Sequence, residues 1–161
     1  LSEGLVIDIS TFFDPIPANG EGPVVQPTAR RSVTRRGEGL LVETPDYDYR
    51  YLCTDLSRKG MVPILITIRA RSTEKLNAFS SHSGEEFIYV LRGSIEVHTE
   101  FYEPIFLAAG DSIYIDSRMK HASLSSGPRS ATVLNICWSP QAGHFRSLYE
   151  LALSAAALDA R

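Results

Sequence analysis

The sequence predicts an all-β protein with a short helix near each end, and two observations carry that prediction. Between residues 39 and 139, short apolar or alternating runs are separated by turns rich in glycine, proline and aspartate. Short strands at such regular spacing are typical of an antiparallel sandwich or barrel. Outside this region, apolar residues recur with helical spacing near the two ends of the chain, where we expect one short helix each.

The length and composition fit one domain with its own core. The 161 residues carry a net charge of −3, too small to indicate a nucleic-acid-binding surface over the whole chain. No apolar run approaches the ~20 residues that cross a bilayer, and no signal peptide is recognisable. Cys53 and Cys137 lie in strand-like runs and favour buried thiols in a reducing compartment, with a single disulfide left open. These features predict a cytoplasmic protein.

The N-terminal segment contains a predicted helix, a linker and a basic stretch. Residues 1–14 place their apolar side chains with helical spacing, and residues 15–23 are rich in proline and glycine, as linkers are. Residues 28–39 contain four arginines. Four arginines here indicate either a DNA-backbone patch or, as we favour, the solvated face of a first strand with its turn.

The strands are expected to follow one another from residue 39 onward. They are predicted at residues 39–45, 49–56, 61–70, 86–91, 94–99, 103–111 and 111–116, from His121, and at 130–139. Pro63 places the third strand at a sheet edge or lies near the start of that strand. In the last strand, Asn135 and Cys137 share one face. Residues 144–158 predict a C-terminal helix that packs on the barrel or on a twofold mate.

Three ligand-type residues stand out in this pattern. Glu86 begins the run EFIYVL, and strand alternation places it on the same face as Ile88. A carboxylate in line with aliphatic side chains needs a partner or a metal. His82 precedes Glu86 by four residues, an even spacing that allows the same face, although residues 83–84 make this uncertain. His121 opens a later strand and is the third candidate.

The segments HSGEEFIYVLRG (82–93) and GDSIYIDSRMKH (110–121) resemble the two motifs of the cupin superfamily, G(X)5HXH(X)3,4E(X)6G and G(X)5PXG(X)2H(X)3N. His82 matches the second histidine of the first motif and Glu86 its glutamate. His121 matches the histidine of the second motif. Gly93 and Gly110 take the remaining matched glycine positions. The resemblance implies a double-stranded β-helix, or jelly-roll barrel, with short N-terminal and C-terminal helices.

The departures from the motifs affect the expected metal site. Ser80 stands in place of the first histidine; Asp116, Arg118 and Ser125 replace the proline, glycine and asparagine of the second motif. Two alternatives therefore stay open for His82, Glu86 and His121. They hold one divalent transition metal (Zn, Ni, Mn or Fe), or they form a metal-free polar floor in which Glu86 pairs with a protonated histidine or a ligand amine.

The expected ligand-binding residues are Ser80, Ile88 and Tyr114. Ser80 is a poor metal ligand but can hydrogen-bond a water in the position of the missing histidine. Tyr114 lies in the strand of the second motif, and its facing is open. His98 alternates with Glu96 on what the sequence predicts to be a solvated strand face, so we expect it outside the site.

A second resemblance concerns function. The phrase LSEGLVIDISTFF is similar to the end of the helix-turn-helix domain in XRE-type bacterial transcription regulators, in which a cupin follows. This resemblance implies that residues 1–23 are the remnant of that domain plus a linker, 24–143 the cupin barrel and 144–161 a C-terminal helix. It further implies a non-enzymatic, effector-sensing homodimer that contacts DNA through helices preceding Leu1. The alternative is a stand-alone, metal-dependent cupin enzyme, such as a dioxygenase or an isomerase.

Overall fold

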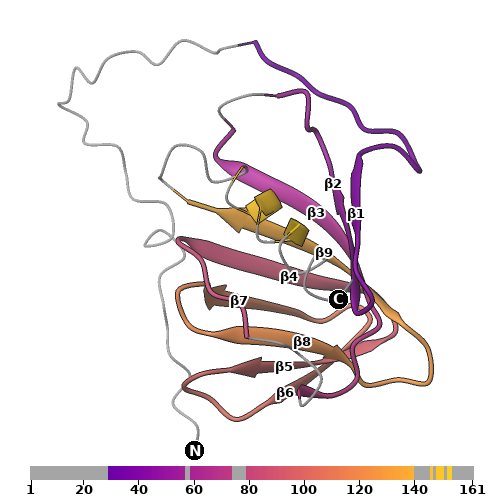
Figure 1. Ribbon diagram of the computed structural model, residues 1–161, viewed down its shortest axis with the longest axis vertical. Helices are drawn as coiled ribbons and strands as arrows, with labels where there is room; N and C mark the ends of the chain where they lie inside the picture. Colours follow the sequence, from indigo (N-terminus) through magenta and orange to yellow (C-terminus); the bar gives the residue numbers. More distant parts are fainter. Residues whose placement is uncertain are drawn as a thin grey trace, which may run out of the picture. The chain divides into compact units, whose positions relative to one another are not determined.

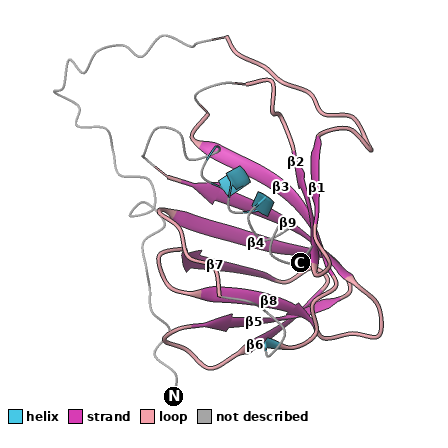
Figure 2. Cartoon of the chain, viewed as in Figure 1, coloured by secondary structure: helices cyan, strands magenta, loops and turns pink. Residues whose placement is uncertain are grey.

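The computed structural model describes residues 29–56, 59–73, 79–139, 146, 148–150 and 152–153. Regular structure in these residues is almost entirely β (Figure 2). The chain divides into the units Leu1–Arg30 and Arg31–Arg161, and all elements below belong to the second. The predicted helix at 1–14 and the linker at 15–23 lie outside the described residues, so the domain boundaries drawn there stay predictions.

The described strands form two antiparallel sheets (Figure 1). In order they are β1 (Leu40–Glu43), β2 (Tyr47–Tyr51), β3 (Met61–Ile68), β4 (Glu85–Arg92), β5 (Ser94–Thr99), β6 (Ile105–Ala108), β7 (Ser112–Asp116), β8 (His121–Ser125) and β9 (Ala131–Trp138). One sheet has the order β1-β2-β3-β9-β4-β7 and the other β6-β5-β8. The last strand, β9, is therefore inserted between β3 and β4. The all-β prediction is confirmed.

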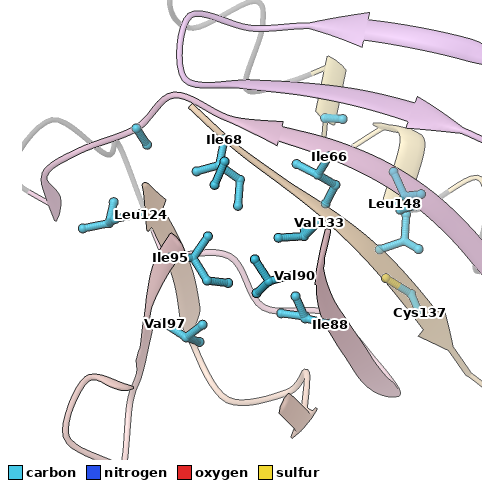
Figure 3. Packing of buried hydrophobic residues seen from close by; sticks show 14 of the residues in the cluster. Ile66, Ile68, Ile88, Val90, Ile95, Val97, Leu124, Val133, Cys137 and Leu148 are labelled. Carbon is cyan, nitrogen blue, oxygen red and sulfur yellow. The ribbon is translucent and has the colours of Figure 1, made fainter. Parts of the chain in front are cut away.

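Strand alternation produces the core. Along β3 and β9 every second side chain is buried, as expected for β-branched runs on a sheet with one face toward the core. Figure 3 shows Ile88, Val90 and Val133 of the larger sheet near Ile95 and Val97 of the smaller one. Burying each such side chain stabilises the fold by about 1.5–3 kcal/mol.

The C-terminal prediction agrees with the described residues there. Residues 146, 148–150 and 152–153 are helical, and Leu148 and Ala152 join the core. The Tyr51 hydroxyl donates to the Leu148 carbonyl at 3.0 Å, which ties this segment to β2. In the described part of the chain, no helix is long and apolar enough to span a membrane.

Pro63 fulfils one of its two predicted alternatives, and Cys53 corrects a detail of the prediction. Pro63 lies near the start of β3, which begins at Met61. The strand is not at a sheet edge, because β3 pairs with both β2 and β9. The Pro63 carbonyl accepts a hydrogen bond from Leu52 N, directly after β2 ends at Tyr51. The edge of β3 on which Pro63 lacks an N–H therefore faces the chain beyond the end of β2. Cys53, expected inside a strand, follows β2 with a φ of 53° that ends the strand. Both cysteines are free thiols.

Candidate metal and ligand site

The three predicted ligand residues come together at the inner side of the fold. His82 precedes β4, Glu86 is the second residue of β4, and His121 opens β8 in the other sheet. His82 Nε2 lies 2.5 Å from Glu86 Oε1, and His121 Nε2 lies 3.5 Å from the same oxygen. The three ligand atoms all lie within 4.8 Å of one another. We call these three residues the His–Glu–His cluster.

The turn at Gly84 resolves the parity that the sequence left uncertain. Gly84 has a φ of +106°, a region that side chains other than glycine rarely adopt. A Cβ at this position would lie 1.9 Å from the Trp138 carbonyl oxygen, so β4 starts in direct backbone contact with β9. His82 N donates to the Ser117 carbonyl on the other side of the turn. The turn therefore holds His82 above Glu86 on the same face.

His121 is fixed by its own backbone and side-chain bonds. Its N and O exchange hydrogen bonds with Ser80 at 2.9 and 3.0 Å, and its ring Nδ1 lies 2.8 Å from the Met119 carbonyl. A carbonyl only accepts, so Nδ1 carries the proton and donates. Nε2 therefore points at the cluster. This arrangement, with the far nitrogen bonded to a carbonyl, is typical of metal-binding histidines.

The cluster is buried, and its charges support one another. Glu86 is 4% exposed, and each histidine side chain is 8% exposed. Burial alone would raise the pKa of Glu86, but the hydrogen bonds from His121 and His82 hold that pKa below its ordinary value. Burial acts to lower the pKa of His121, yet the bond to Glu86 and its charge raise it. Without a metal, an ionised Glu86 and a protonated His121 are thus the favoured pair.

Two further residues on β9 contact Glu86. Asn135 Nδ2 donates to Glu86 Oε2 at 3.3 Å, and the Cys137 thiol donates to Oε1 at 3.5 Å. Burial, with the Glu86 charge as a smaller cause, raises the pKa of Cys137, so in the metal-free chain Cys137 stays a protonated thiol. The sequence predicted that these two residues share a face. It gave no signal that β9 pairs with β4 in the register that sets them beside Glu86.

Tyr49 is a further residue that the sequence did not single out. It lies on β2 in register with Ile66 of β3 and packs against the core. Burial raises the pKa of Tyr49, and the charges of neighbouring tyrosines and of Glu86 add to the effect. The phenol therefore keeps its proton and stays a hydrogen-bond donor near the cluster.

The predicted ligand-binding residues have different outcomes. Ser80 Oγ lies 3.4 Å from His121 Nε2, at the edge of the cluster. Ile88 is buried on the same face as Glu86. Tyr114 is 63% exposed and pairs with Phe87, on the opposite face of the sheet. Because Ile115, not Tyr114, is the partner of Glu86, strand alternation turns the Tyr114 side chain away from the cluster.

Other residues of the motifs serve the local structure. Asp116 and Arg118 pair with each other at the surface, with Nη2 and Oδ2 2.6 Å apart. The Ser125 hydroxyl donates to the Arg129 carbonyl. His98, predicted to be solvated, is only partly exposed, because it lies 3.2 Å from Glu96 and against the ring of Phe79. It remains outside the cluster.

Comparisons with known proteins agree with this fold. A family model described as "Cupin domain" matches residues 72–137. The solved structure of hydroxypropylphosphonic acid epoxidase from S. wedmorenis matches with a TM-score of 0.59 at 20% identity, over 67% of this chain and 59% of that one. The crystal structure of FeII HppE matches with a TM-score of 0.57 at 21% identity, over 67% and 60%.

An HTH_3 family transcriptional regulator from Vibrio cholerae has a TM-score of 0.49 at 21% identity, over 60% of this chain and 52% of that one, a likeness that supports no inference about function. No curated protein matches the sequence. The chain spans about three fifths of the length of the two epoxidase structures, and at 20–21% identity they show the fold alone. Together, the motif segments, the strand order and the family model establish that residues 72–137 form a cupin domain.

Proposed function

We propose that this cupin domain is the small-molecule-sensing part of a DNA-binding transcription regulator, and that its effector binds at a metal held by the His–Glu–His cluster. The observation that carries the proposal is the ligand set itself. Two imidazoles and one carboxylate converge within 4.8 Å, and Ser80, which matches the missing histidine of the motif, lies beside His121. Three protein ligands leave coordination positions for an exogenous molecule.

The donors of the cluster fit a divalent transition metal. Imidazole and carboxylate together suit Zn, Fe, Ni or Mn, and the His121 Nδ1 bond to Met119 leaves Nε2 for the metal. In the metal-free chain, the side chains of His121 and Glu86 are hydrogen-bonded. A metal would take the place of the proton in that hydrogen bond. When bound, it would supply a Lewis-acidic attachment point for an oxygen donor of the effector.

The surroundings of the cluster favour binding over catalysis. Two titratable groups outside the cluster, Tyr49 and Cys137, lie close enough to Glu86 for its charge to act on them. Burial raises the pKa of both, so neither is a base at neutral pH. In the metal-free chain, neither of these two groups is poised for proton abstraction. A sensor needs no such group.

The regulatory mechanism is a population shift. The sequence phrase at residues 1–14 and the proline- and glycine-rich residues 15–23 support a DNA-binding domain and a hinge before the cupin domain. Bound effector changes DNA affinity only if it binds one arrangement of a homodimer better than the other. Effector binding and operator affinity are then coupled in both directions.

The experiment measures metal content and DNA binding in the natural full-length protein. Elemental analysis without added metal should find about one equivalent per chain, reduced to background in His121→Ala and Glu86→Ala. His98→Ala, which removes a histidine outside the cluster, should keep the metal. DNA duplexes selected from a random pool should bind the wild-type protein. Metal removal should change the DNA affinity of the wild-type protein but not that of the cluster variants. A full-length protein that selects no DNA would contradict the regulator.

The second candidate is a metal-dependent cupin enzyme, and the same ligand set favours it. A cluster of two histidines and one carboxylate is also the set used by non-haem Fe(II) oxygenases. Substrate-dependent O2 consumption by the Fe(II)-loaded protein, abolished in Glu86→Gln, would establish it in place of the sensor. Turnover that survives Glu86→Gln would argue against chemistry at the metal.

A further inference from the structure

Asn135 is the residue beside the cluster whose hydrogen bonding is incomplete. It lies on β9 with 6% of its surface exposed, and its Nδ2 donates to Glu86 Oε2 at 3.3 Å. Its Oδ1 is buried and has no hydrogen-bond partner among the described residues. The opposite orientation of the amide would turn Oδ1 toward a carboxylate, which only accepts hydrogen bonds. Glu86 therefore fixes the amide with Oδ1 facing away from it.

The two strand neighbours of Asn135 offer Oδ1 no donor. The residues in register with Asn135 are Ile64 on β3 and Ile88 on β4, and both are buried aliphatic side chains. A buried acceptor without a donor destabilises a fold, and native proteins contain few of them. Leucine would fill a similar volume on this face without that penalty. An unpaired acceptor beside a ligand cluster thus indicates that its donor arrives with a ligand.

The position of the acceptor defines the chemistry of that ligand. One end of the amide contacts a carboxylate oxygen of the cluster, so Oδ1 lies one amide width from it. If a ligand is held at the cluster by a carboxylate oxygen, the group that pairs with Oδ1 would be carried on the carbon next to that carboxylate. Only a hydroxyl or an amine on that carbon can donate. A 2-oxo group presents acceptors alone and would leave Oδ1 unpaired.

We infer that Asn135 is a specificity residue that selects a ligand with a hydrogen-bond donor next to its metal-binding oxygen, as in 2-hydroxy or 2-amino carboxylates. The inference rests on the proposed function, because it places the ligand at the His–Glu–His cluster. It adds the substrate class, which the cluster alone does not determine.

The test uses three acids of similar size on Co(II)-loaded protein. Lactate carries the donor, pyruvate replaces it with an acceptor, and propionate has neither. Visible absorption of Co(II) reports both metal loading and ligand binding. Lactate should bind the wild-type protein about tenfold or more tightly than pyruvate, the value of one hydrogen bond. Asn135→Leu should bind the two equally. Cys137→Ala is the matched control, since it also loses one donor to Glu86 but keeps Oδ1.

Each outcome decides one of the two proposals. Equal binding of lactate and pyruvate by the wild-type protein, or a preference that persists in Asn135→Leu, would overturn the role of Asn135. Failure to bind any of the acids would overturn it as well. Absence of Co(II) absorption would instead overturn the metal centre. In that case the three acids are titrated by NMR against the metal-free protein. A preference for lactate over pyruvate that is lost in Asn135→Leu would support the inference. Its absence would overturn the inference.

Discussion

The two halves of the β4–β9 strand pair differ in what they place on the inner face of the sheet. In one half, Val90 is in register with Val133. In the other, Glu86 is in register with Cys137, one step from the pair formed by Ile88 and Asn135. The paired side chains on the inner face are buried in both halves. The halves differ in the chemistry of these buried groups and in the ladder, which shifts register between Val90 and Arg92 in the aliphatic half.

This difference distinguishes the part of the interior that stabilises the fold from the part that binds. In the aliphatic half every buried side chain contributes free energy of burial without needing a partner. In the polar half each buried group needs a hydrogen bond, and Glu86 has donors from four side chains. Such a network stabilises the fold only while each of its members keeps its partner and its charge.

The first and largest predicted effect concerns the turn that joins the polar half to His82. Gly84→Ala places a Cβ 1.9 Å from the Trp138 carbonyl oxygen at a φ of +106°. The start of β4 must then move away from β9. We expect a loss of more than about 3 kcal/mol in unfolding free energy, beyond the usual cost of such strain, together with loss of metal binding. Chemical denaturation and metal titration measure the two.

Gly110→Ala is the matched control for that turn. Gly110 has a φ of +100°, but a Cβ there meets no atom within 4 Å. The Gly110→Ala variant should lose only the free energy that a side chain costs at a positive φ, about 1–2 kcal/mol. It should keep its metal. If the two variants lose the same stability, the close approach of β4 and β9 at Gly84 is not what positions His82.

The second prediction concerns how the stability that each half contributes depends on pH in the metal-free chain. The lowered pKa of Glu86 contributes stability above its unfolded value of 4.5, and this contribution is lost as the pH falls through the folded pKa. The raised pKa of His121 contributes stability below its unfolded value of 6.5, lost as the pH rises through the folded pKa. Both contributions are complete between pH 4.5 and 6.5.

We therefore expect Glu86→Gln to lose most stability inside that window, by about 1–3 kcal/mol, and less above it. Ile68→Ala, in the aliphatic core, should lose about 2–5 kcal/mol at every pH. Urea denaturation of the three proteins at pH 5.5 and pH 8 measures both. A Glu86→Gln loss that is independent of pH would mean that the charges of the cluster do not support one another.

The sequence predicted the cluster better than its surroundings, for a physical reason. His82, Glu86 and His121 were recognisable because ligand-type residues at motif spacing are rare in strand sequences. Asn135 and Cys137 were not, because their role depends on the register between β9 and β4. Pairing between strands that are distant in the chain leaves no local signal.

The strand boundaries and facings show the same limit. Alternation correctly predicted which side chains share a face in β4 and β9, where the runs are long. It left Tyr114 undecided, because β7 is short and both of its faces carry large apolar side chains. Only the pairing of Ile115 with Glu86 fixes which face is inside.

Tyr114 provides the last and smallest predicted effect. Its side chain is exposed on the opposite face of the sheet, with Glu85 as its hydrogen-bond partner. Tyr114→Phe removes that exposed bond and should change the unfolding free energy by no more than about 0.5 kcal/mol. Metal content and the lactate preference should be unchanged, because neither half of the inner face is altered. A Tyr114→Phe protein that binds metal or lactate more weakly would show that the site extends around the edge of β7, and that the polar half of β4 and β9 is not the whole of it.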